Sequence, residues 1–259
     1  ITCGKLLLIL WKTFFNNIIH TLINTVWIIN KIYVIINYML IINIINVYKI
    51  IYMRGSTVLN TPDYKKTRHI ALLAVFVAII IIQTVVPFLG FIPLGVINAT
   101  IIHITVIVAT ILLGLKSGMF LGFVFGLSSL LKNTFAPGLV SFCFSPFVPN
   151  GNIKSVFVSI VPRIMIAVVS YYVYKLFDKY MNSNIALVLT GAIGSISNTV
   201  LVLGSIYFLF GNEYATVTNT GMNMLVYSIL GIVATNGLAE AIVSAVITYG
   251  LTSVLKKVY

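Results

Sequence analysis

Residues 70–87 read IALLAVFVAIIIIQTVVP, an apolar run without a charged side chain. Its length approaches the roughly 20 residues that an α-helix needs to cross a bilayer. Five more apolar segments follow at about 99–115, 117–133, 154–177, 185–210 and 224–255. We therefore expect six membrane-spanning helices.

The composition of the whole chain supports this expectation. Of its 259 residues, 60% are hydrophobic and only 8% are charged, and the mean hydropathy is +1.10. A soluble protein carries about 25% charged residues, so this chain cannot cover its surface with polar side chains. Lipid-exposed backbone must satisfy its own hydrogen bonds, and long apolar segments favour helices over a barrel. The predicted fold class is an all-α integral membrane protein, a bundle of six transmembrane helices.

The formal net charge is +12, from 16 basic and 4 acidic residues. The basic residues lie mostly between the apolar segments, at Lys65, Lys66, Arg68, Lys116, Lys175, Lys179, Lys256 and Lys257. Basic residues concentrate in cytoplasmic loops, which explains this charge better than nucleic-acid binding does. The pattern predicts a multi-pass protein with both ends of residues 53–259 in the cytoplasm.

The first 52 residues differ from the rest of the chain. They are rich in Ile, Asn, Tyr and Lys, which have AT-rich codons, and they contain no Asp, Glu or Pro. We favour the hypothesis that residues 1–52 are an AT-codon-biased, non-native extension and that Met53 is the natural start. The alternative is one or two extra membrane helices. Residues 53–259 then form the six-helix domain.

Several polar residues lie within or beside the apolar segments. They are Asn98, His103, Arg163, Asn198, Asn236 and Glu240. A charged side chain at the centre of a membrane helix costs about 2.5–3.5 kcal/mol on insertion scales, so it usually faces a cavity or a partner. One interpretation is a polar ligand site open to the outside. The other is a structural ion pair between Arg163 and Glu240, with the asparagines bonding between helices.

Small residues recur at a spacing that indicates close helix packing. Gly118, Gly122 and Gly126 recur every fourth residue, which predicts close helix packing inside the bundle. Ala74 and Ala78 have the same spacing.

The two cysteines and three histidines form no metal-ligand pattern, and the chain has no phosphate-binding loop. We therefore expect no metal site, no enzyme activity and no ATP hydrolysis by this chain.

Seven short stretches together resemble the substrate-binding S components of energy-coupling factor (ECF) vitamin transporters, most closely the pantothenate-type branch. They are residues 91–95 (FIPLG), 99–107 (ATIIHITVI), 111–118 (ILLGLKSG), 122–129 (GFVFGLSS), 145–149 (SPFVP), 162–163 (PR) and 236–240 (NGLAE). The resemblance covers roughly residues 65–257 and leaves out residues 1–52.

The resemblance implies a protein of a prokaryotic plasma membrane that captures a B-type vitamin, with pantothenate as the best guess, from outside the cell. Delivery would need a membrane T component, met by Ala74 and Ala78, and two ABC-type ATPase subunits that use ATP. This chain would bind no cofactor itself. The implied substrate-binding residues are Asn98, His103, Arg163, Asn198, Asn236 and Glu240.

Two alternatives remain open. The chain could be an S component for another vitamin such as folate, or for a pyrimidine precursor. It could also be a stand-alone secondary transporter of a small organic solute, although the sequence shows no evident inverted repeat of the kind many such carriers have.

Overall fold

A computed structural model of the chain describes residues 62–86, 90–94, 97–219 and 221–258. The chain divides into two units, residues 1–47 and 48–259, and every described residue belongs to the second. The predicted extension, residues 1–52, lies outside the described residues.

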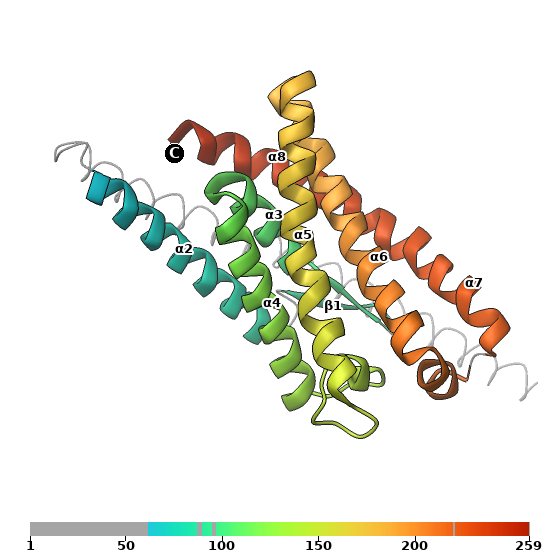
Figure 1. Ribbon diagram of the computed structural model, residues 1–259. Coiled ribbons are helices and arrows are strands. Elements are labelled where there is room, and N and C mark those ends of the chain that lie inside the picture. Colours follow the sequence, from blue (N-terminus) through green and yellow to red (C-terminus); the bar gives the residue numbers. More distant parts are fainter. Residues whose placement is uncertain (1–61, 87–89, 95–96, 220, 259) are drawn as a thin grey trace, which may run out of the picture. The chain divides into compact units, whose positions relative to one another are not determined.

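The described residues form a helical bundle with one short hairpin (Figure 1). In chain order its elements are α2 (Pro62–Val85), β1 (Phe91–Leu94), β2 (Ile97–Thr100), α3 (Ile102–Leu113), α4 (Leu115–Phe135), η1 (Ser141–Cys143), α5 (Ile153–Tyr180), α6 (Ser183–Val217), α7 (Met222–Ile232), η2 (Val233–Gly237) and α8 (Leu238–Val258). Within these residues, five helical stretches are long and apolar enough to cross a membrane, and α3 is a shorter apolar helix. The prediction of an all-α membrane bundle is confirmed.

The second predicted helix, residues 99–115, is shorter than the sequence indicated. The antiparallel hairpin of β1 and β2 pairs Phe91 with Thr100, so α3 begins only at Ile102. Its 12 residues span about 18 Å, less than the roughly 30 Å hydrocarbon core of a bilayer. Helix α3 packs against α2, α4, α5, α6 and α8 and is buried on nearly every side, which is why its sequence is apolar all round.

The sixth predicted segment, residues 224–255, is not one continuous α-helix. A π-helical turn, η2, separates α7 from α8. Such turns are rare and often occur at functional sites. Here the turn lies just before Glu240, which is in the first turn of α8.

The glycine stripe on α4 faces the interior of the bundle. A Cβ atom added to Gly122 would lie 2.5 Å from the carbonyl oxygen of Arg163, and one added to Gly126 would lie 2.8 Å from that of Ser159. Both contacts are too short for any side chain, so the two glycines let α4 approach α5 closely. This confirms the interpretation that the stripe serves packing within the bundle.

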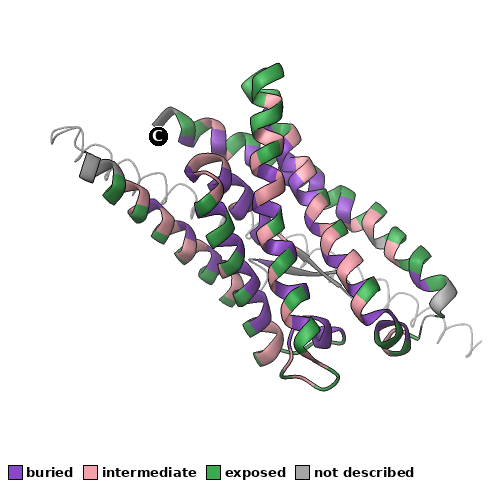
Figure 2. Ribbon diagram, viewed as in Figure 1, coloured by how far each residue is buried: buried purple, intermediate pink, exposed green. Residues whose placement is uncertain are grey.

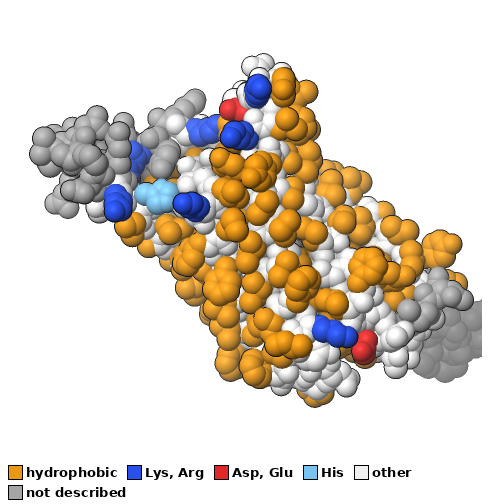
Figure 3. All heavy atoms as spheres, viewed as in Figure 1, with side chains coloured by type: hydrophobic (Ala, Val, Ile, Leu, Met, Phe, Trp, Pro, Cys, Tyr) orange, Lys and Arg blue, Asp and Glu red, His pale blue; other side chains and the backbone are white. Residues whose placement is uncertain are grey.

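The outer faces of the helices carry large apolar side chains. On α4, Phe120, Phe123, Leu127 and Leu131 are all exposed, and exposed positions recur along the outer helices (Figure 2). An apolar surface of this extent is suited to lipid rather than water. Figure 3 shows basic side chains gathered where α2 begins and α5 ends, with the apolar surface between the charged ends of the bundle.

Candidate functional site

Polar groups from three elements meet where the hairpin ends and α3 begins. The backbone N–H of Thr100 donates to Oε1 of Glu240 on α8 at 3.0 Å. The hydroxyl of Thr199 on α6 lies 3.5 Å from Oε2 of the same carboxylate, at the limit for a hydrogen bond. Glu240 therefore links the end of the hairpin to α8 and contacts α6.

His103 is fully buried one residue into α3. Its Nε2 lies 3.1 Å from the hydroxyl oxygen of Ser195 on α6, and its Nδ1 lies 3.4 Å from the hydroxyl oxygen of Thr100. Both ring nitrogens thus have partners within the protein. His103 would have to give up one of these partners to bind a ligand directly.

Gln83 was not predicted as a site residue. It is buried near the end of α2, and its Oε1 accepts a hydrogen bond of 2.9 Å from the Thr105 hydroxyl on α3. A buried amide within so apolar a run is the signal that could have identified it. The pair ties α2 to α3 beside the polar groups around His103.

Arg163 on α5 is the most unusual buried group, with 4% of its surface exposed. Its Nη1 donates to the carbonyl oxygen of Val158 at 2.8 Å. Its Nε is buried and has no hydrogen-bond partner among the described residues. Its Cζ lies 5.5 Å from the ring centroid of Phe125 on α4 and 5.3 Å from that of Phe144. These distances fall within the roughly 6 Å range of cation–π interactions.

The alternative interpretation of an ion pair between Arg163 and Glu240 is wrong for the part of the chain that the structure describes. The Glu240 carboxylate contacts Thr100 and Thr199 instead, and the guanidinium bonds only to the Val158 carbonyl. Helical spacing placed both groups at similar depth, but it could not show that they point in different directions. Two phenyl rings offset part of the cost of burying the arginine charge, and no carboxylate among the described residues neutralises it.

Asn198 also has a free polar atom. Its side chain is 6% exposed, and its Oδ1 is buried without a hydrogen-bond partner among the described residues. It lies three residues after Ser195, close to one turn along α6, and Ser195 is the partner of His103. A buried, unpaired amide oxygen can accept a hydrogen bond from a ligand hydroxyl or N–H group.

The other two predicted site residues are less well defined. Asn98 lies on β2, where its backbone pairs with that of Pro93, and its side chain is outside what the structure describes. Asn236 is half-buried in η2, and its amide oxygen accepts a long hydrogen bond of 3.5 Å from Thr235. The structure therefore groups His103 and Glu240 around Thr100 and places Asn198 about one turn from Ser195. Among the described residues, Asn236 makes no hydrogen bond to any of these side chains.

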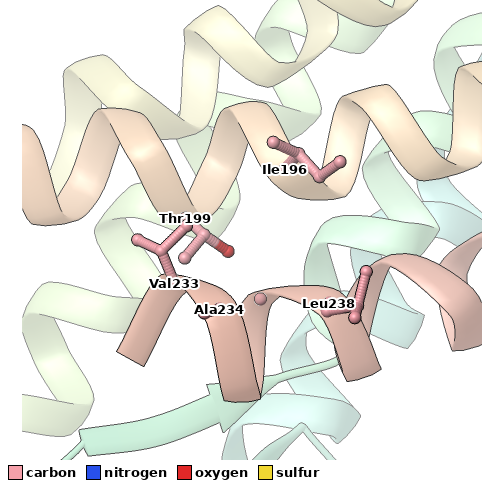
Figure 4. A pocket seen from close by; sticks show the side chains of 6 residues that line it. Ile196, Thr199, Val233, Ala234 and Leu238 are labelled. Carbon is pink, nitrogen blue, oxygen red and sulfur yellow. The ribbon is translucent and has the colours of Figure 1, made fainter. Parts of the chain in front are cut away.

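A pocket of about 310 Å³ lies between α6 and the η2–α8 junction. Ile196 and Thr199 approach it from α6, and Val233, Ala234 and Leu238 face them (Figure 4). Its lining is almost wholly apolar and includes none of the six predicted site residues. With this lining the pocket is unsuited to a charged group.

Within the described residues, no group of three or more His, Cys, Asp or Glu side chains could hold a metal ion. Among the described residues, the buried side-chain polar atoms without a hydrogen-bond partner include Nε of Arg163 and Oδ1 of Asn198. The first can donate a hydrogen bond to an anion, and the second can accept one from a donor group.

Comparison with known proteins gives a consistent result. The family model described as "ECF transporter, substrate-specific component" matches residues 68–252. The pantothenic acid transporter PanT of Lactococcus lactis subsp. cremoris (strain MG1363) is 34% identical over 198 residues, which cover 74% of this chain and 95% of the relative. The pantothenate transporter PanT of Leuconostoc mesenteroides subsp. mesenteroides is 29% identical over 201 residues, covering 73% of this chain and 93% of the relative.

Proposed function

This chain belongs to the substrate-specific components of ECF transporters, and we propose that it captures pantothenate from outside the cell. The observation that carries the choice of an anionic substrate is the buried guanidinium of Arg163, which has a free Nε–H and no acidic partner among the described residues. The names of the two relatives support pantothenate as that anion.

The geometry of the guanidinium suits a carboxylate. Its Nε–H and one Nη2–H point the same way along one edge of the planar group, and this edge can bind both oxygens of a carboxylate. The Val158 carbonyl occupies Nη1, on the other side. A carboxylate at the free edge would therefore gain two charge-assisted hydrogen bonds and neutralise the buried charge.

The remainder of pantothenate matches the other free group. The molecule has two hydroxyls and one amide N–H, and each can donate a hydrogen bond to the unpaired Oδ1 of Asn198. We propose that His103 and Glu240, whose polar atoms already have partners, shape the site around the substrate. Asn98 and Asn236 remain proposed contacts at its edge.

Delivery into the cell is proposed to require an ECF T component and two ATPase subunits. Ala74 and Ala78 lie one turn apart on α2, and both are exposed. Two small side chains at this spacing leave a shallow face against which a partner helix can pack closely. ATP hydrolysis would occur in the partner subunits.

The orientation in the membrane is proposed from the distribution of charge. Lys116 lies at the start of α4, Lys175 and Lys179 lie in the last two turns of α5, and Lys256 lies in the last turn of α8. Basic residues favour the cytoplasmic side, so both ends of residues 53–259 would face the cytoplasm of a prokaryotic cell. The opposite end of the bundle would then receive the substrate from outside.

Isothermal titration of the purified protein with pantothenate, folate and riboflavin tests the proposed substrate. We expect saturable binding of pantothenate and no heat of binding with the other two vitamins, because they do not combine a single short carboxylate arm with adjacent hydroxyl donors. A protein that binds folate or riboflavin, and not pantothenate, would contradict the proposal while leaving the family assignment intact.

A further inference from the structure

Pro162 occupies an interior position of α5 and is buried. In a regular α-helix the N–H of residue i donates to the carbonyl oxygen of residue i−4. Proline has no N–H, so it cannot supply the donor for the Val158 carbonyl. A buried carbonyl without a partner destabilises the folded state, so another donor is needed at this point.

The side chain of the next residue, Arg163, supplies this donor. Nη1 of Arg163 donates to the Val158 carbonyl oxygen at 2.8 Å in a buried hydrogen bond. The bond that proline removes from the backbone is thus replaced by one from a guanidinium. It fixes one edge of the planar group against its own helix.

The surroundings hold the helix and the guanidinium in this arrangement. Gly122 and Gly126 bring α4 against the backbone of Arg163 and Ser159. The Ser159 hydroxyl donates to the Phe144 carbonyl oxygen at 2.6 Å, which anchors the segment whose ring lies near the Arg163 charge. The Nη1 edge is therefore secured, while the Nε–H has no partner within the described part of the chain.

We propose that Pro162 is a positioning residue for substrate binding: by leaving the Val158 carbonyl free, it draws in Nη1 of Arg163 and so presents the Nε edge to the substrate carboxylate. This inference rests on the proposed function, since it concerns how the same anion is bound. It assigns to the proline a role in recognition that is separate from bending or packing the helix.

Replacing Pro162 by alanine tests the inference, because alanine supplies the missing N–H and restores the backbone bond to Val158. Nη1 of Arg163 then loses its fixed partner. We expect the affinity for pantothenate to fall about threefold to tenfold, the size of one lost hydrogen bond. The affinity for pantothenol, in which a hydroxymethyl group replaces the carboxylate, should change less than about twofold by the same conversion. The melting temperature should not fall, since alanine favours helix.

Two controls isolate the backbone N–H. Lactic acid at position 162, introduced by nonsense suppression, has the alanine side chain but no N–H, and should bind pantothenate like the unmodified protein. In an Arg163→Met background, Pro162→Ala should cause no further loss, because a residue that acts through Arg163 has no effect once that side chain is gone.

The results of these measurements distinguish failure of the Pro162 inference from failure of the proposed function. If Pro162→Ala binds pantothenate as tightly as the unmodified protein, or loses pantothenate and pantothenol affinity equally, Pro162 does not position Arg163. If the lactic acid variant is as weak as the alanine variant, the ring and not the missing N–H is responsible, and the inference is wrong. If the unmodified protein binds no pantothenate, the proposed function fails and this inference with it.

Discussion

At the scale of single residues, the proposed binding of pantothenate depends most on Arg163. Replacing it with glutamine removes the charge and the free N–H edge, and charge-assisted hydrogen bonds are worth about 1.5–3 kcal/mol each. We expect Arg163→Gln to weaken pantothenate binding by about tenfold to a hundredfold, measured by isothermal titration of the purified, folded variant. The pantothenate affinity of Arg163→Lys should lie between those of the unmodified protein and Arg163→Gln, since lysine keeps the charge and loses the planar fork.

A purely structural role for Arg163 predicts a different result. The variant would then unfold at a lower temperature, while the fraction that remains folded would bind pantothenate as before. Comparing melting temperature and affinity on the same sample separates the two roles. Undiminished affinity in Arg163→Gln would remove Arg163 from the site.

The sequence predicted the buried residues of the site better than their partners. Arg163, Asn198 and His103 are buried, as expected of polar groups within apolar segments. The partner of Glu240 could not be predicted, because position along a helix gives depth in the bundle and not the direction of the side chain. The Thr100 backbone that Glu240 binds belongs to a hairpin that the apolar pattern concealed.

At the scale of elements, hydropathy located the helices and missed their interruptions. A short strand and a buried helix are both apolar runs, so Ala99 and Thr100 of β2 appeared to be part of the helix that begins at Ile102. Likewise the π-helical turn Val233–Gly237 is apolar or small apart from Thr235 and Asn236. Boundaries of this kind depend on backbone hydrogen bonds that residue type alone does not specify.

The small-residue face of α2 leads to a prediction about transport. Replacing Ala74 or Ala78, both exposed on α2, with leucine should block the close approach of a partner helix. Uptake of labelled pantothenate by cells that supply the T component and the ATPases should be lost, while binding by the purified variant is retained.

Ala239→Leu is a matched control, because Ala239 is an exposed alanine on a different helix, α8. We expect it to support normal uptake. Normal uptake by both α2 variants would reject the docking role, and loss of uptake in all three would show only that added bulk on the lipid-facing surface is harmful.

At the scale of the whole molecule, the charge distribution predicts orientation. Lys179 lies near the end of α5, and Glu213 lies near the far end of the next helix, α6. The two residues therefore lie at opposite ends of the bundle, and both are exposed. With Cys3 replaced by serine, a cysteine at position 213 should react with an impermeant thiol reagent added to intact cells, and one at position 179 should not. Reversed labelling would overturn the proposed topology.

The remaining native cysteine should not obscure this measurement. Cys143 lies in η1, outside the membrane-spanning helices, and its side chain is buried. Burial, together with the nearby Glu213 charge, raises the pKa of its thiol to about 12. Since the thiolate is the reactive form, Cys143 should stay unlabelled near neutral pH. The Cys3→Ser protein without an introduced cysteine provides this control.

The central claim is that a buried guanidinium without an acidic partner in the described bundle selects a carboxylate substrate. The most direct measurement is isothermal titration of the unmodified protein with pantothenate and with pantothenol, which differ only at the carboxylate. We expect pantothenate to bind at least about tenfold more tightly than pantothenol, which corresponds to one charge-assisted hydrogen bond. Equal affinity for the two ligands, or no binding of pantothenate, would contradict it.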